Sequence, residues 1–181
     1  MVPQEIRRSV LEYLQTPLRT NLSGVEVIEP LWVGEQGDVR FGRSKATPGR
    51  MLQVVDYTDP HGQSRHFVFY LRQEEDGSWS VHGGGGGSGG VVIRPYPWLN
   101  LAASWGDFGM WAGGYVSDNG TGVTRARLIG PDNLLMEDTI AEGRALFMTE
   151  HPVHDLAPIT AELFNGSGEL VGSHKAFAAR Q

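Results

Sequence analysis

The chain has 181 residues, a formal net charge of −6 and no cysteine. The acidic balance argues against nucleic acid or an anionic membrane surface as the main partner. The absence of cysteine excludes disulfides, thiolate metal sites and cysteine nucleophiles, and it fits a reducing compartment, so we expect a cytoplasmic protein.

An amphipathic helix is predicted near the start of the chain. Ile6, Val10, Tyr13 and Leu14 recur at helical spacing and form one apolar stripe, and Pro17 ends the pattern. Four or five short strands are predicted to follow, with turns between them. In chain order these strands cover residues 25–33, 38–43, 51–58, 66–73 and 79–81. One helix on an antiparallel sheet is an α+β architecture.

The end of this first half carries a family resemblance. A strand at His66–Gln73 is followed by the turn Asp76-Gly77 and by a closing strand that contains Trp79. Together with the N-terminal helix, this arrangement resembles the cystatin-like, nuclear-transport-factor-like α+β roll superfamily. The resemblance implies a helix packed on a curved sheet. Enzymatic members usually have several helices where this sequence offers one.

The two central strands of the first half are apolar on both faces. Phe67, Phe69 and Leu71 alternate with a second set that includes Val68 and Tyr70. The first set is expected to receive the helix stripe. In a sheet with one solvent-exposed face, apolar and polar residues alternate more regularly along each strand. We therefore expect the second face to be covered, and we favour a homodimer that covers it.

The run Gly83–Gly90 has seven glycines in eight residues. Glycine has no side chain whose burial could offset its backbone entropy, so the run predicts a flexible linker, either natural or engineered. It is expected to be the most mobile internal segment. The sequence therefore predicts two domains, residues 1–82 and 91–181, joined by the linker at 83–90.

Seven short strands with frequent turns are predicted after the glycine run. They cover residues 96–102, 110–116, 123–129, 134–140, 145–149, 159–164 and 169–177. This spacing favours a β-sandwich of immunoglobulin-like type. The segment from Tyr115 to Glu150 resembles small bacterial immunoglobulin-like modules, although the Cys–Trp–Cys pattern of antibody domains is absent.

Two groups of side chains are candidates for binding a ligand. His66, Tyr70 and Arg72 share one face of a strand and could line a pocket of the first half. The aromatic residues of the second half could form a stacking platform for a sugar, and their main members are Trp98, Trp105 and Trp111. Packing in the core is the competing interpretation of these tryptophans.

The densest metal-capable cluster is His151, His154 and Asp155, which we interpret as a polar loop rather than a metal site. The glycine run contains the spacing of a dinucleotide fingerprint but leads into two prolines instead of a helix. We therefore expect no tightly bound structural metal, no cofactor and no catalytic residue.

These patterns favour a two-domain, non-enzymatic binding or interaction protein whose partner is unknown. Two alternatives remain open. One is a small-molecule enzyme or ligand-binding protein that uses a pocket in the first half. The other is a carbohydrate-binding module that uses the aromatic residues of the second half.

Overall fold

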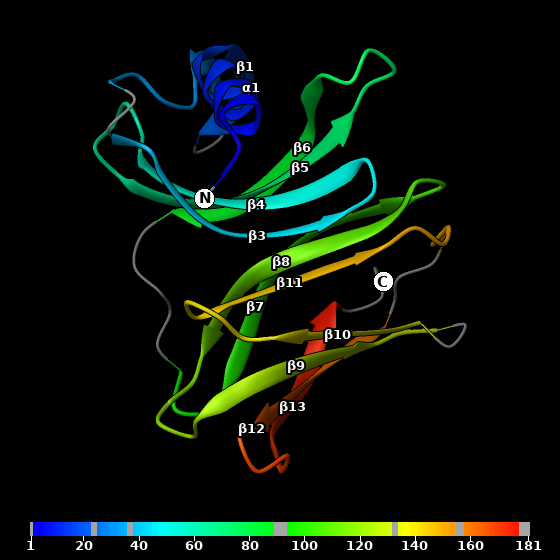
Figure 1. The fold of residues 1–181 in the computed structure, drawn as a ribbon. Helices are drawn as coiled ribbons and strands as arrows, with labels where there is room; N and C mark the ends of the chain where they lie inside the picture. Colours follow the sequence, from blue (N-terminus) through cyan, green and yellow to red (C-terminus); the bar gives the residue numbers. More distant parts are fainter. Residues whose placement is uncertain are drawn as a thin grey trace. The chain divides into compact units, whose positions relative to one another are not determined.

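The computed structural model of the protein describes residues 2–22, 25–35, 38–88, 94–131, 134–154 and 158–177. Strands make up 61% of the described residues and helix 8%. The described strands form four separate sheets (Figure 1). By its contacts the chain divides into two compact units, residues 1–90 and 91–181, and the glycine run belongs to the first.

The first unit contains one helix, a hairpin and a four-stranded sheet. The helix is α1 (Gln4–Gln15), and the strands are β1 (Pro17–Leu22), β2 (Val25–Pro30), β3 (Arg40–Thr47), β4 (Arg50–Thr58), β5 (Ser64–Gln73) and β6 (Trp79–Ser88). Among the described strands, β1 and β2 pair only with each other, and the sheet has the antiparallel order β3-β4-β5-β6.

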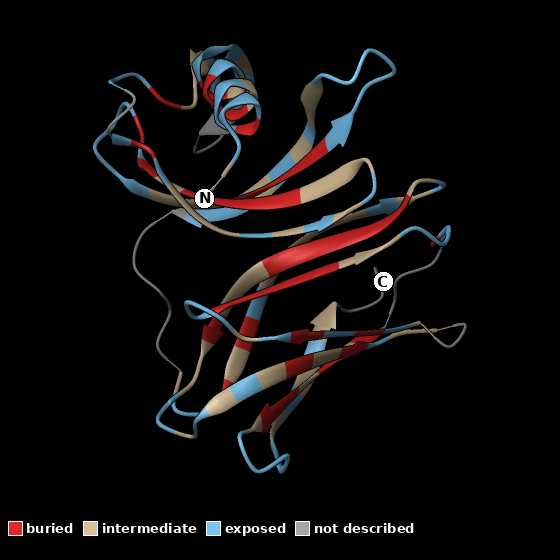
Figure 2. Ribbon diagram, viewed as in Figure 1, coloured by how far each residue is buried: buried red, intermediate tan, exposed pale blue. Residues whose placement is uncertain are grey.

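The core of the first unit lies between α1 and one face of this sheet. Ile6, Val10 and Leu14 of the helix are fully or almost fully buried against β4 and β5, where they meet Phe69 and Leu71. The predicted helix stripe and its partner face are therefore confirmed. Buried residues, drawn red in Figure 2, follow the helix stripe and these strands.

The glycine run is not a linker over most of its length. Residues Gly83–Ser88 continue β6, and they pair with β5 down to the start of that strand. A Cβ atom at Gly84 would lie 2.8 Å from a ring atom of Phe69, so the aromatic side chain of the neighbouring strand occupies the space that a β6 side chain would need. Phenylalanine rings that cover glycines across a sheet give such a strand apolar contacts of its own. Residues 89–90 lie outside the described residues.

The second face of the sheet carries Leu52, Val54, Val68 and Tyr70, as the alternation along β4 and β5 predicts. The homodimer that was expected to cover this face stays a prediction.

In its described residues, the second unit consists of seven strands in two sheets. The strands are β7 (Trp98–Gly106), β8 (Gly109–Ser117), β9 (Val123–Ile129), β10 (Leu135–Thr139), β11 (Arg144–Thr149), β12 (Ile159–Asn165) and β13 (Leu170–Phe177). One sheet has the order β11-β8-β7 and the other β10-β9-β12-β13. Buried side chains from both sheets form one core, with Phe147 and Leu99 from the first sheet and Leu128 and Leu163 from the second.

The predicted fold class, an α+β roll followed by an immunoglobulin-like sandwich, is wrong. The chain is mostly β, and its one α-helix in the described residues has 12 residues. In the first unit, two segments form strands that were not predicted. The glycine run extends β6 and joins the sheet, and β1 pairs with β2 in a hairpin. None of the helices in the described part of the chain is long and apolar enough to span a membrane.

Candidate functional site

A small pocket in the first unit lies between the end of β2 and the turn that joins β4 to β5. Its volume is about 160 Å³. Apolar and aromatic side chains form most of its wall, and ionisable side chains stand among them. The lining residues are Glu29, Pro30, Leu31, Tyr57, Asp59, Pro60, Arg65 and Phe67.

An ion pair between Asp59 and Arg65 holds one side of this pocket in place. The Nη2 and Nε atoms of Arg65 lie 2.6 and 2.8 Å from Oδ2 of Asp59, whose side chain is only 5% exposed. The other carboxylate oxygen accepts hydrogen bonds from the backbone N–H groups of His61 and Gln63, at 2.9 and 2.8 Å. Asp59 therefore fixes both the turn and the guanidinium.

The pKa of Asp59 reflects these contacts. Burial by itself raises the pKa, but the hydrogen bonds from Gln63, Arg65 and His61 outweigh it, and the pKa falls below its ordinary value. Asp59 is therefore an anion at neutral pH whose charge is already compensated. It is a structural carboxylate and not an available base.

Two aromatic rings form the floor of the pocket. Tyr57 lies opposite Arg65 in the β4–β5 ladder, and its ring centre is 5.9 Å from that of Phe67. Burial raises the pKa of Tyr57 well above its ordinary value of 10.0, so the phenol stays neutral. Within the described part of the chain, its hydroxyl group has no hydrogen-bond partner. It is therefore free to bond a ligand.

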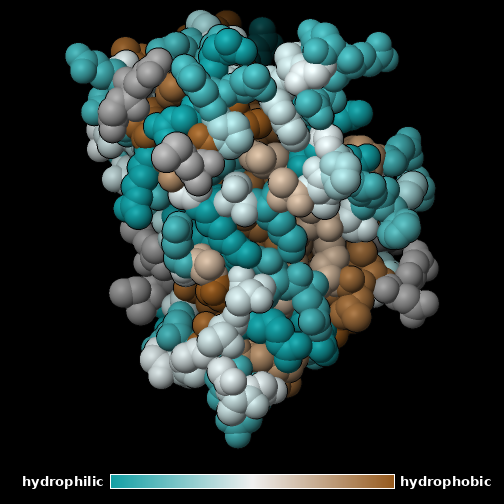
Figure 3. Space-filling view, viewed as in Figure 1, coloured by the Kyte–Doolittle hydropathy of each residue, from teal (hydrophilic) through white to brown (hydrophobic). Residues whose placement is uncertain are grey.

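A second ion pair stands at the rim. Nε2 of His61 lies 2.8 Å from a carboxylate oxygen of Glu29, and this hydrogen bond raises the pKa of His61. Ile28 and Val33, which lie close in sequence to the lining residues Glu29–Leu31, are 65% and 67% exposed. Hydrophilic residues cover most of the face seen in Figure 3, with smaller hydrophobic areas between them.

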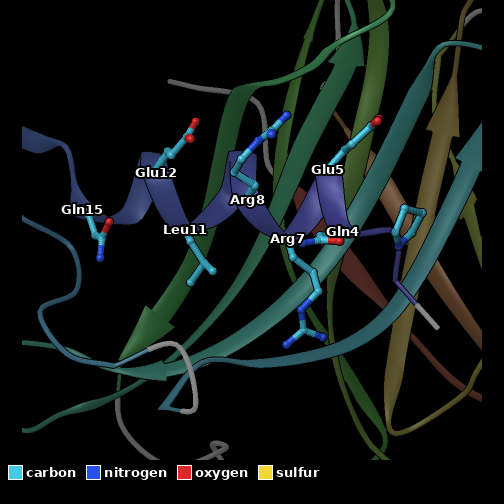
Figure 4. A pocket seen from close by; sticks show the side chains of 8 residues that line it. Gln4, Glu5, Arg7, Arg8, Leu11, Glu12 and Gln15 are labelled. Atoms are coloured by element: carbon cyan, nitrogen blue, oxygen red, sulfur yellow. The ribbon is translucent and has the colours of Figure 1, made fainter.

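A second cavity, of about 1100 Å³, runs along α1. Its described lining comes from the helix and the residue before it: Pro3, Gln4, Glu5, Arg7, Arg8, Leu11, Glu12 and Gln15. Glu5, Arg8 and Glu12 point to one side of the helix, and Arg7 and Leu11 point to the other (Figure 4). These side chains converge on no common centre, so the cavity is a weaker candidate than the pocket.

The ligand-binding residues predicted on β5 do not line the pocket described above. His66 and Tyr70 share a face with Arg72, as the alternation predicts. However, Nδ1 of His66 lies 2.8 Å from Oδ1 of Asp56, Tyr70 is buried, and Arg72 is exposed at the far end of the strand. The pocket uses the opposite face of β5, through Arg65 and Phe67.

The three candidate tryptophans do not form one platform. Trp111 is buried at 3% exposure, and Trp105 lies on the opposite face of the same sheet. The ring of Trp98 stacks on His174 with 3.7 Å between centres, and the guanidinium of Arg94 lies 4.4 Å from its centre. The Trp98 ring is thus already packed against its own chain, which leaves little of it for a sugar.

The structure describes the histidine loop only as far as His154. His151 and His154 are exposed, and Asp155 lies outside the described residues. Nδ1 of His154 is 3.5 Å from Oδ1 of the highly exposed Asp107. Over the described ranges, no three His, Asp or Glu side chains come together in a way that could hold a metal ion.

Sequence reasoning missed the pocket because its residues looked structural one by one. The segment from Asp59 to Gly62 has the composition of a turn, and it forms one. The signal that could have revealed more is the pairing across that turn, where Tyr57 precedes Asp59 and Arg65 precedes Phe67. An aromatic ring and an ionisable group on each side of one hairpin are brought together by antiparallel pairing.

Comparison with known proteins adds no family. No protein-family model matches the chain, and no curated protein or solved structure does so either. The resemblances to the cystatin-like superfamily and to immunoglobulin-like modules therefore stay predictions. The case for function depends on the pocket.

Proposed function

We propose that this protein is a binding protein whose first unit takes one neutral aromatic ring, carrying a hydrogen-bond acceptor, into the pocket between β2 and the β4–β5 turn. The observation that carries the proposal is a pocket of benzene-like size floored by Tyr57 and Phe67. Its volume of about 160 Å³ is close to that of engineered apolar cavities, roughly 150 Å³, that bind benzene.

The charges around the pocket support a neutral ligand. Asp59 is paired with Arg65, and Glu29 is paired with His61, so each carboxylate already has a basic partner. A charged ligand would find no unpaired partner there and would lose its hydration on entering. We therefore expect both anionic and cationic rings to bind more weakly than neutral ones.

Two groups can orient the ligand. Arg65 uses Nε and Nη2 for Asp59, and a guanidinium has five N–H donors, so it keeps others for an acceptor. The Tyr57 hydroxyl can also donate. Because the ion pairs are internally satisfied, the arrangement supports binding rather than turnover. A cytoplasmic location is part of this proposal and is favoured by the absence of cysteine.

Titration of the ¹⁵N-labelled full chain with three single-ring probes tests the proposal. Benzamide is neutral with a carbonyl acceptor, benzoate is its anionic relative, and benzylamine is a cation at neutral pH. For so small a ligand the benzamide Kd is expected on the order of 1 mM. Benzamide should shift the amide signals between Asp59 and Phe67 and bind at least about fivefold more tightly than either charged probe, a difference of about 1 kcal/mol.

A matched pair of variants localises the binding. Leu31→Trp places a larger side chain at the pocket wall and should abolish the benzamide shifts, whereas Leu135→Trp, at an exposed leucine of the second unit, should leave them unchanged. Unaltered benzamide binding by Leu31→Trp, in a protein that keeps the wild-type spectrum elsewhere, would refute the proposal.

A further inference from the structure

The outer edge of β6 has no strand partner among the described residues. Strand β6 is the last strand of its sheet and pairs only with β5 among the described strands. Its residues Gly83–Gly87 carry no side chains, and Gly84, Gly86 and Gly87 are exposed. An edge strand turns backbone N–H and C=O groups outward at alternate residues, and these groups can pair with another chain.

The opposite edge of the same sheet has the usual protection. Strand β3 carries Arg40, Arg43 and Lys45, and its pairing with β4 is interrupted by a bulge between Phe41 and Ser44. Charges and bulges are the devices by which natural sheets discourage added strands. The glycine edge has neither a charge nor a proline between Gly83 and Gly87.

The glycine edge carries no charged side chain of its own between Gly83 and Gly87. A charged segment would find no opposite charge on these residues, so an uncharged segment fits this edge better than a charged one. The ring of Phe67 lies opposite Gly86 and is only partly buried, so it can contact an apolar side chain that reaches across the glycine.

We propose that the edge Gly83–Gly87 accepts an extended, uncharged peptide segment of another protein as a fifth strand of the sheet. Backbone hydrogen bonds to β6 would hold the segment, and apolar side chains at alternate positions would pack over the glycines against Phe67. A second copy of this chain fits less well, because its own β6 offers only glycines in that stretch. Such a seam would bury far less than the roughly 1,600 Å² of a standard interface.

The experiment uses the ¹⁵N-labelled full chain and an uncharged synthetic peptide, QVTVTVTQ with blocked ends, in which apolar residues alternate. The peptide should shift the amide signals of Gly83–Gly87 and slow their hydrogen exchange at least threefold. The peptide QVTPTVTQ, whose proline removes a ladder donor, should do neither.

Two lysine variants separate the edges. A Cβ at Gly87 would meet nothing within 4 Å, so Gly87→Lys keeps the fold while it adds a charge to the edge, and it should weaken peptide binding at least tenfold. Ala46→Lys adds the same charge at an exposed position of β3 and should have no effect. Absence of any shift in Gly83–Gly87 at millimolar peptide would overturn the proposal. So would equal binding of the proline peptide, or a dimer in sedimentation that Gly87→Lys abolishes, because a second copy would then be the occupant.

Discussion

Gly86 and Phe67 lie opposite each other in the β5–β6 ladder, and a Cβ atom at Gly86 would stand 2.7 Å from the Phe67 ring. It would also stand 2.0 Å from the carbonyl oxygen of His66. Glycine is thus required at this position by its neighbours and not by an unusual backbone angle. The run of glycines is part of the sheet because two phenylalanines of β5 occupy the space above it.

Gly86→Ala is therefore expected to lower the free energy of unfolding of the first unit by about 2 kcal/mol or more, since the methyl group can fit only if the strands move apart. Gly87→Ala is the matched control. Its Cβ would meet nothing within 4 Å, and replacing a glycine in a compatible conformation changes stability by about 1 kcal/mol at most, in the favourable direction. Urea unfolding of both variants measures the difference. Equal stabilities would show that β6 does not approach β5 in this way.

Asp59→Asn tests the ion pair that shapes the pocket. The variant leaves Arg65 without its partner in a mostly buried setting, so we expect a loss of about 2–3 kcal/mol at pH 7. The folded pKa of Asp59 is lowered, which means that its contribution is present above the ordinary value of 3.8 and is lost as pH falls through the folded pKa. The stability difference between wild type and variant should therefore shrink in acid.

The control for that measurement is Asp107→Asn, because the side chain of Asp107 is 97% exposed. Its unfolding curve should follow the wild type at every pH. If Asp59→Asn also left the free energy of unfolding unchanged at pH 7, the turn would be held by its backbone alone, and the pocket would have no fixed guanidinium.

His174 gives the second unit an expected pH dependence. Its Nε2 lies 3.0 Å from the carbonyl oxygen of Leu99, and burial lowers its pKa below the ordinary value of 6.5, with Arg94 acting in the same direction. The unfolded chain therefore takes up a proton more readily than the folded one, and the free energy of unfolding should fall as pH drops below 6.5.

His174→Phe keeps an aromatic ring next to Trp98 but cannot ionise. Urea unfolding followed by tryptophan fluorescence should show a smaller change between pH 7.5 and pH 5 for this variant than for the wild type. His151→Phe, which replaces an exposed histidine, should retain the wild-type change. A wild-type stability that is constant over this range would contradict the assigned direction of the His174 pKa.

The parts of the fold that sequence could predict are those with a clear apolar period. Helical spacing predicts an apolar stripe of Ile6, Val10 and Leu14, and strand alternation predicts which face of β5 carries Phe69. In the structure this stripe packs against that face. The glycine strand could not be predicted in this way. The side chains that stabilise β6 belong to Phe67 and Phe69 of the neighbouring strand. The sequence of β6 itself consists mostly of glycine and therefore predicts a flexible segment.

The candidate site was harder to predict for a similar reason. The residues chosen on β5, His66 and Tyr70, were selected because they share a face, but sharing a face does not create a cavity. The pocket needs a third segment, Glu29–Leu31, which approaches the β4–β5 hairpin from a separate two-stranded sheet. Strand periodicity carries no information about how two sheets approach each other.

The most direct test of the account is to locate a bound ring. Intermolecular nuclear Overhauser effects between benzamide ring protons and the full-length protein report which side chains it touches. The account predicts contacts to the rings of Tyr57 and Phe67 and to the side chain of Leu31, all lost in Leu31→Trp. Contacts to Trp105 or to the surface of α1 instead, or no contacts with benzamide well above 1 mM, would contradict it.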